Sequence, residues 1–185
     1  MNLPNCLTIA RVILIPIFLF FLFVRFAPEP IGHYLAAFIF IFAALTDGLD
    51  GYLARSRKQV SRFGRFMDPI ADKLLVTAAL VSLVALGDVG PLPVIIILGR
   101  EFAVSGLRSL AAAEGIEIAA TKWGKVKTIT QVVAISVILL NNFPFSLFNF
   151  PFDRIALWFA VFVTIYSGFD YFLHFRYLLT HESNP

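Results

Sequence analysis

Long runs of apolar residues alternate with short connectors along the chain. Six of these runs have about the 20 residues that a helix needs to cross a bilayer, and each predicts a membrane-spanning helix. They cover approximately residues 7–26, 32–54, 70–87, 91–113, 124–141 and 152–178. The connectors include APEPIG, GDVGPLP and NNFPFSLFNFPF, which are rich in turn-forming residues. Since the sequence has no internal repeat, we predict a single all-α domain over residues 1–185.

The composition indicates that this domain is an integral membrane protein. Charged residues make up 15% of the chain, against about 25% in an ordinary soluble domain, and the mean hydropathy is +0.84. The first apolar run contains Arg11 and follows no basic segment, so we do not expect a cleaved signal peptide. Without a transit peptide, a bacterial inner membrane is the expected location. The single cysteine, Cys6, excludes an internal disulfide framework.

The charges of the connectors predict the orientation in the membrane. Basic residues gather in or beside the second and fourth connectors: Arg55, Arg57, Lys58, Arg62, Arg65, Lys122, Lys125 and Lys127. The opposite set of connectors offers only Arg25 and Arg154. Because positive residues remain on the cytoplasmic side, we expect both termini and the second connector to be cytoplasmic.

Four aspartates flank the second connector. Asp47 and Asp50 are three residues apart near the end of the second predicted helix, and Asp68 and Asp72 are four apart near the start of the third. Each spacing places its two carboxylates on one face of a helix. A short connector makes the helices antiparallel, so we expect the two pairs to face each other near the inner membrane surface.

Four neighbouring carboxylates repel one another, and a charge at the middle of a membrane helix costs about 2.5–3.5 kcal/mol. One or two divalent cations would remove both costs. Oxygen-only ligands favour Mg²⁺ or Mn²⁺ over zinc, and no histidine or cysteine lies near the aspartates in the sequence. The alternative is that the four aspartates are helix-end residues paired with the neighbouring arginines.

Small residues and one arginine lie between the two pairs. Gly51, Ala54 and Gly64 leave space for a ligand to approach the backbone, although small residues also allow helices to pack closely. Arg55 could hold a phosphate group.

Together these residues form the pattern D-x-x-D-G-x-x-A-R, eight residues, G-x-x-x-D-x-x-x-D. It resembles the signature of the CDP-alcohol phosphatidyltransferases at all eight fixed positions. The resemblance implies six transmembrane helices, a homodimer and a polar cavity open to the cytoplasm. It also implies transfer of a phosphoalcohol group from a CDP-alcohol to an acceptor hydroxyl, with release of CMP.

The resemblance further assigns roles to individual residues. Asp47, Asp50, Asp68 and Asp72 would hold a two-metal centre, and Asp72 would also act as the general base. The CDP moiety would be bound by the residues between them, Gly51, Ala54, Arg55 and Gly64. We expect direct in-line displacement, because none of the three histidines lies in the His-x-Lys motif of the covalent phosphatidyltransferases.

The acceptor is suggested by a second stretch, residues 99–131. Arg100 and Glu101 lie within the fourth predicted helix, where an ion pair or polar contact is expected. Nearby cations suggest an acceptor that carries its own phosphate: Arg100, Arg108, Lys122, Lys125 and Lys127. The positive-inside rule alone could also explain these cations.

Several motifs in this stretch resemble the branch of the family that uses glycerol 3-phosphate. They are R-E-F, a downstream L-R, K-W-G-K-V-K-T and Gln131. The opening NLPNCLTIARVILIP resembles that branch too, and the resemblance then extends from residue 2 to about residue 131. It implies that CDP-diacylglycerol and glycerol 3-phosphate give phosphatidylglycerophosphate and CMP. Asn5, Thr8 and Arg11 are candidates for the CDP-lipid entry, although Thr8 could equally cap a helix.

Two alternatives remain open at this point. Within the family, the acceptor could be inositol phosphate, phosphatidylglycerol or serine. Outside it, the aspartates could belong to a divalent-cation transporter, although no second polar pair continues a path across the other half of the membrane. We expect the lipid bilayer as a partner and no nucleic acid.

Overall fold

The structure is a computed structural model that describes residues 3–24, 31–57, 62–113, 115 and 121–180, with side chains for 9–24, 31–46, 70–71, 73–113, 115 and 121–173. Six α-helices and one 3-10 turn account for nearly all of these residues: α1 (Leu3–Phe23), α2 (Ile31–Arg57), α3 (Arg62–Leu86), α4 (Pro91–Ala113), α5 (Lys122–Leu139), η1 (Phe145–Phe148) and α6 (Phe152–Thr180). No strand occurs within the described ranges. The predicted all-α fold with six helices is therefore confirmed.

The helix boundaries agree with the apolar runs to within four residues, except at the start of α3. This helix begins at Arg62, eight residues before the predicted start at residue 70. Its first two turns contain Arg62 and Arg65, so the hydrophobic pattern marks the apolar part of the helix rather than its full length. Thr8 lies inside α1, which begins at Leu3, rather than at the start of that helix.

Length and composition support membrane crossing for the helices to different degrees. In the part of the chain that was described, Phe152–Leu173 of α6 is the one segment both long and apolar enough to span a bilayer. Shorter apolar segments occur at Ile9–Phe23, Ile31–Thr46 and Lys73–Leu86. Crossing by all six helices thus stays a prediction.

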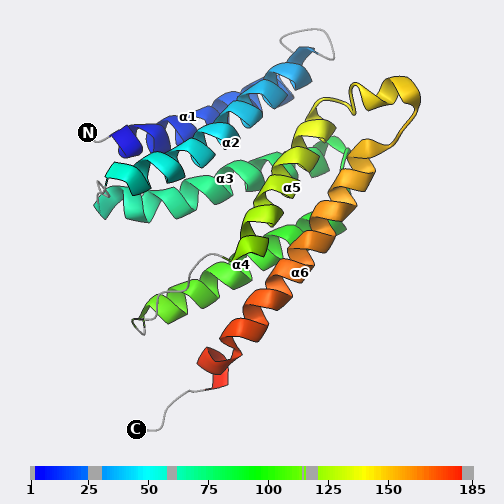
Figure 1. Ribbon diagram of the computed structural model, residues 1–185. Coiled ribbons are helices and arrows are strands. Elements are labelled where there is room, and N and C mark those ends of the chain that lie inside the picture. Colours follow the sequence, from blue (N-terminus) through cyan, green and yellow to red (C-terminus); the bar gives the residue numbers. More distant parts are fainter. Residues whose placement is uncertain (1–2, 25–30, 58–61, 114, 116–120, 181–185) are drawn as a thin grey trace.

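The helices form two groups of three (Figure 1). In the first group α1 packs against α2 and α3, and in the second α6 packs against α4 and α5. Contacts of α2 with α5 and of α3 with α4 and α5 join the groups. The end of α2, the start of α3, the end of α4 and the start of α5 lie toward the same end of the molecule (Figure 1). The helix ends nearest the two basic connectors therefore share one end of the fold.

Alanine residues allow the helices of the first group to approach closely. Ala36, Ala37 and Ala43 of α2 and Ala79 of α3 are all fully buried. Small side chains at helix interfaces are typical of membrane bundles, where close backbone approach provides much of the packing energy. Larger side chains fill the rest of this core, including Phe18 of α1, which lies with its ring centroid 6.2 Å from that of Phe40.

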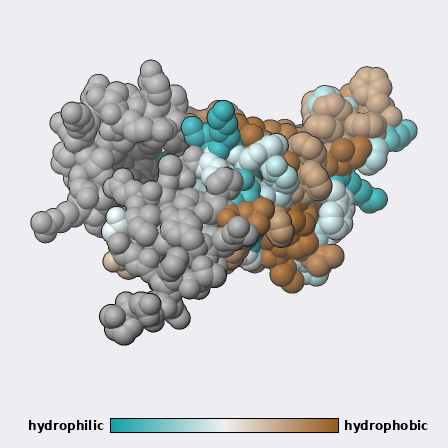
Figure 2. All heavy atoms as spheres, turned by 60° about the horizontal axis from the view of Figure 1, so that its bottom comes forward, coloured by the Kyte–Doolittle hydropathy of each residue, from teal (hydrophilic) through white to brown (hydrophobic). Residues whose placement is uncertain are grey.

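Much of the described outer surface is apolar, and several polar side chains are buried. Phe38, Phe162 and Phe169 are between 66% and 68% exposed, whereas Gln131 and Ser167 are buried. Figure 2 shows brown, hydrophobic surface over much of the described part of one face, with teal side chains beside the grey region and again toward the opposite end. A large exposed apolar surface indicates a membrane or a protein partner, and its extent over many helices favours a membrane.

Asn142 fixes the entry of the chain into α6. Its side-chain amide donates a hydrogen bond to the carbonyl of Phe150 (2.7 Å), and its side-chain oxygen accepts one from the backbone N–H of Asp153 (3.2 Å). The backbone of Asn142 has φ +57°, a left-handed conformation that asparagine tolerates better than most residues. The residue thus ties the connector after α5 to the first turn of α6.

Candidate active site

A cavity of about 600 Å³ opens where the two helix groups meet, and all six helices contribute to its lining. Six cationic side chains line it: Arg11, Lys73, Arg100, Arg108, Lys125 and Lys127. Glu101 is the one carboxylate among the described lining residues. Much of the remaining lining is apolar and includes Leu98, Phe102 and Ile129. Such a cavity suits an anionic group attached to an apolar molecule.

Arg100 extends from the middle of α4 and is held mainly by α6. Its Nη2 donates a hydrogen bond of 2.6 Å to Ser167 Oγ, and its guanidinium carbon lies 5.5 Å from the ring centre of Tyr171. Its Nη1 lies 3.5 Å from Glu101 Oε1. The side chain is only 10% exposed, so the charge is positioned by several fixed neighbours rather than by solvent.

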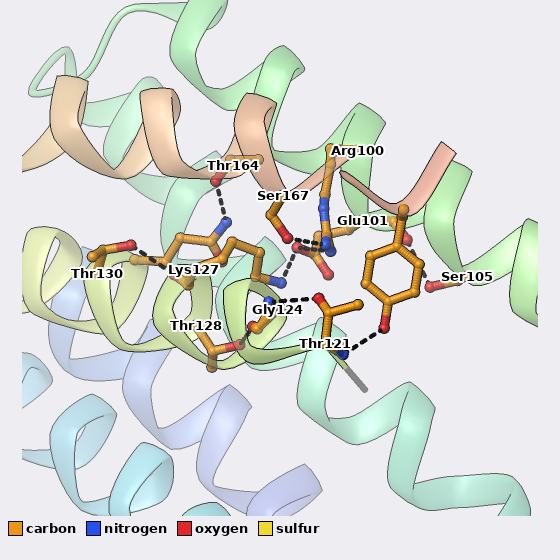
Figure 3. A network of polar contacts seen from close by, with 12 residues as sticks. Arg100, Glu101, Ser105, Thr121, Gly124, Lys127, Thr128, Thr130, Thr164 and Ser167 are labelled. Atoms are coloured by element: carbon orange, nitrogen blue, oxygen red, sulfur yellow. Dashed lines mark hydrogen bonds and ion pairs between the residues drawn. The ribbon is translucent and has the colours of Figure 1, made fainter. Parts of the chain in front are cut away.

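Glu101 joins α4 to α5 through Lys127. The ammonium group of Lys127 donates a hydrogen bond to Glu101 Oε1, the oxygen that Arg100 also approaches. The side chains of Lys127 and Glu101 are 8% and 15% exposed. Because a buried charge needs a partner, Glu101 allows two cations to remain side by side in the cavity wall (Figure 3).

The start of α5 is fixed by a cap and by a contact with α6. The hydroxyl oxygen of Thr121 accepts a hydrogen bond from the backbone N–H of Gly124 (3.1 Å). The backbone N–H of Thr121 donates to the Tyr171 hydroxyl (3.3 Å). Further along α5, the Gln131 amide donates to Thr164 Oγ1 (3.0 Å). These contacts, drawn in Figure 3, set the rotation of the helix that carries Lys125 and Lys127.

The structure brings together most of the predicted acceptor residues. Arg100, Arg108, Lys125 and Lys127 all line the cavity, whereas Lys122 is exposed at the start of α5 and is not part of the lining. Arg11, a candidate for the lipid entry, lines the cavity and is 3% exposed.

The predicted metal and CDP residues occupy α2 and α3, but their side chains lie outside the described residues: Asp47, Asp50, Gly51, Ala54, Arg55, Gly64, Asp68 and Asp72. Two described neighbours relate them to the cavity. Ala44, one helical turn before Asp47, and Lys73, next to Asp72, both belong to the lining. Among the described residues no group of three or more histidine, cysteine or acidic residues could hold a metal ion. The roles of these eight residues stay predictions.

Ser167 and Tyr171 of α6 were not predicted as site residues, because the sequence of that helix reads as one apolar span. A signal was nevertheless present. Thr164, Ser167 and Tyr171 are spaced three and four residues apart, which places three polar groups on one face of an otherwise apolar helix. The Lys127–Glu101 contact joins residues 26 positions apart, and no local pattern indicates it.

Comparison with known proteins identifies the family. The sequence profile of the CDP-alcohol phosphatidyltransferases matches residues 1–166 of the chain. The chain belongs to this family. The family is membrane-associated and uses divalent metal ions, so the resemblance recognised from the aspartate signature is confirmed.

Relatives with curated names cover nearly the whole chain. A Bacillus subtilis (strain 168) protein is 47% identical over 180 residues, covering 92% of this chain and 93% of the relative. A Rickettsia bellii protein is 39% identical over 172 residues, with the same coverage. A Haemophilus influenzae protein is 41% identical over 176 residues, covering 92% and 91%. All three carry the name CDP-diacylglycerol–glycerol-3-phosphate 3-phosphatidyltransferase, in agreement with the acceptor inferred from residues 99–131.

Proposed function

We propose that this protein transfers the phosphatidyl group of CDP-diacylglycerol to sn-glycerol 3-phosphate, giving phosphatidylglycerophosphate and CMP. The enzyme is then a phosphatidylglycerophosphate synthase of phospholipid biosynthesis. The names of the relatives support this reaction, and family membership argues against the cation transporter considered above.

The observation that carries the choice of acceptor is the excess of positive charge in the cavity. Arg100, Arg108, Lys125 and Lys127 all line it, and in the described lining only Glu101 opposes them. A phosphate group accepts several charge-assisted hydrogen bonds, which are about twice as strong as neutral ones. Serine and other neutral acceptors would leave these cations without a phosphate to bind. Inositol phosphate also carries a phosphate, so an experiment must distinguish it from glycerol 3-phosphate as the acceptor.

The metal ions required by the family would be held by Asp47, Asp50, Asp68 and Asp72. The donor set fits them, because four carboxylates on two helices that contact each other offer only hard oxygen ligands. We propose Mg²⁺ or Mn²⁺, in two sites. When bound, such ions polarise the diphosphate and stabilise the negative charge that develops on the departing CMP.

The protein's own residues would then bind and orient the two substrates and accept a proton from the acceptor hydroxyl. Gly51, Ala54, Arg55 and Gly64 hold the CDP moiety, and the cavity cations hold the acceptor's phosphate. One of the two free hydroxyls of glycerol 3-phosphate attacks the phosphorus that carries the diacylglycerol. A new phosphorus–oxygen bond forms as the bond to the bridging diphosphate oxygen breaks, and Asp72 takes the hydroxyl proton.

The membrane arrangement is part of the proposal. All six helices cross the bacterial inner membrane, with both termini and the active site facing the cytoplasm, and the protein acts as a homodimer. The apolar outer surface supports membrane embedding. The end of α2 and the starts of α3 and α5, where basic residues gather in the sequence, lie toward one end of the fold (Figure 1), which supports the cytoplasmic assignment of that end.

An acceptor panel tests this function. Purified protein in detergent is given CDP-diacylglycerol with Mg²⁺ or Mn²⁺, and CMP release is measured separately with glycerol 3-phosphate, inositol phosphate, serine and phosphatidylglycerol. We expect release with glycerol 3-phosphate alone. Release with a different acceptor would refute the acceptor assignment, and no release with any acceptor in a folded, metal-supplied sample would refute the reaction.

A further inference from the structure

The guanidinium of Arg100 lies in the cavity wall, yet most of its fixed contacts come from one face of α6. Nη2 donates to Ser167 Oγ at 2.6 Å, and the Tyr171 ring faces the guanidinium at 5.5 Å. Ser167 is fully buried and Tyr171 is 2% exposed. A hydrogen bond to a charged group and a cation–π contact both depend on geometry, so these two residues fix where the positive charge lies.

Gly168 completes this arrangement by leaving space for the arginine stem. A Cβ atom at this position would lie 3.0 Å from Arg100 Cγ, closer than carbon atoms normally approach. Glycine in the interior of a helix costs about 1 kcal/mol relative to alanine. Its use here is explained by the passage of Arg100 across the surface of α6.

Tyr171 also connects Arg100 to α5, the helix that carries Lys125 and Lys127. Its hydroxyl accepts the hydrogen bond from the backbone N–H of Thr121, the residue that caps α5. Lys125 and Lys127 follow within two turns. One side chain of α6 therefore contacts both the arginine of α4 and the beginning of the helix that carries the lysines.

We propose that α6 is part of the acceptor site, with Ser167, Gly168 and Tyr171 acting as positioning residues for Arg100. This inference rests on the proposed function, because it assigns the acceptor's phosphate to Arg100. The three residues do not contact the phosphate. They hold the guanidinium where the phosphate must bind, and their loss lowers acceptor affinity while leaving the CDP-lipid side of the site intact.

A pair of glycine-to-alanine variants separates positioning from general stability. Gly168→Ala crowds Arg100, whereas Gly106→Ala on α4 adds its methyl group where no atom other than the adjoining residues and backbone of its own helix lies within 4 Å. We expect Gly168→Ala to raise the KM for glycerol 3-phosphate about tenfold, with the KM for CDP-diacylglycerol unchanged and folding retained. Gly106→Ala should match the wild type in both KM values. Equal acceptor KM values in the two variants would overturn the proposal.

A double-mutant cycle tests whether the effect passes through Arg100. Ser167→Ala should raise the acceptor KM about tenfold in the wild-type background. It should have little further effect when combined with Arg100→Lys, because lysine cannot present the same donor to Ser167. Tyr171→Phe, which keeps the ring and removes the hydroxyl, should have a smaller effect than Tyr171→Leu. A full, independent effect of Ser167→Ala in the Arg100→Lys background would overturn the positioning role.

A binding measurement distinguishes failure of this inference from failure of the proposed function. Thermal stabilisation by glycerol 3-phosphate and by inorganic phosphate is measured for the wild type, Gly168→Ala and Gly106→Ala. Weaker stabilisation of Gly168→Ala alone supports the positioning role, even if the wild type released no CMP and the proposed reaction were wrong. Equal stabilisation of all three proteins by both ligands contradicts the positioning role, whatever the catalytic result.

Discussion

Replacing Glu101 by glutamine should destabilise the protein, because Lys127 and Arg100 share its carboxylate. Glutamine keeps the shape of the side chain and removes only the charge. Breaking a buried ion pair by removing one partner costs about 3–5 kcal/mol. Here the Glu101 and Lys127 side chains are 15% and 8% exposed and line an open cavity, so partial solvation reduces the expected loss to about 1–3 kcal/mol.

This loss can be followed as a change in melting temperature. For a chain of 185 residues, each kcal/mol corresponds to about 2–4 °C, so Glu101→Gln should lower Tm by roughly 2–12 °C. Thermal unfolding in detergent can be monitored by the fluorescence of Trp123 and Trp158. Asp88→Asn, which changes an exposed carboxylate in the turn before α4, is the matched control and should change stability by less than about 0.5 kcal/mol.

A second variant shows whether the charge pair is the cause. Lys127→Met removes the other partner, and in the double variant Glu101→Gln/Lys127→Met no unpaired ammonium remains. The double variant should therefore lose less than the sum of the single losses, by at least about 1 kcal/mol. A Glu101→Gln protein as stable as Asp88→Asn, or strictly additive losses in the double variant, would refute the assignment of Glu101 as the shared partner.

Three further predictions concern the reaction itself. Asp72→Asn should abolish CMP release while retaining the wild-type Tm and some binding of CDP-diacylglycerol, because the proton acceptor is lost while the other three proposed metal ligands and the CDP-binding residues remain; near-normal turnover would rule out Asp72 as the base. Asp47→Asn should raise the Mg²⁺ or Mn²⁺ concentration needed for half-maximal activity, or abolish activity, and an unchanged metal titration would count against ligation by Asp47. Lys125→Ala should raise the KM for glycerol 3-phosphate about three- to tenfold, whereas Lys122→Ala, outside the cavity lining, should remain near wild type; equal effects would contradict the assignment of the acceptor site to this cavity.

The sequence predicted those features that depend on short spacing. Apolar runs located all six helices, and the eight fixed positions between Asp47 and Asp72 identified the family. The start of α3 was misplaced, because hydrophobicity reports burial in an apolar environment and says little about polar turns that continue the same helix. The four aspartates remain predicted metal ligands, because their side chains lie outside the described residues.

The contacts that organise the cavity depend on packing between distant segments. Thr121 and Tyr171 are 50 positions apart, and Arg100 and Ser167 are 67 apart. Their pairing depends on which face of α6 packs against α4 and α5. The hydrophobic pattern of a nearly uniformly apolar helix does not define that face. Of the five cations that the sequence grouped on α4 and α5, four line the cavity and Lys122 does not, while the α6 residues that hold Arg100 became visible only in the fold.

The identity of the lipid product is the most direct test of the proposed transferase. Purified protein is incubated with CDP-diacylglycerol, glycerol 3-phosphate and Mg²⁺ or Mn²⁺, and the lipids and CMP are quantified by mass spectrometry. We predict phosphatidylglycerophosphate and CMP in equal amounts, with neither formed when glycerol 3-phosphate is omitted. CMP accompanied by phosphatidic acid, whether or not glycerol 3-phosphate is present, would show hydrolysis instead of transfer and would contradict the proposed function.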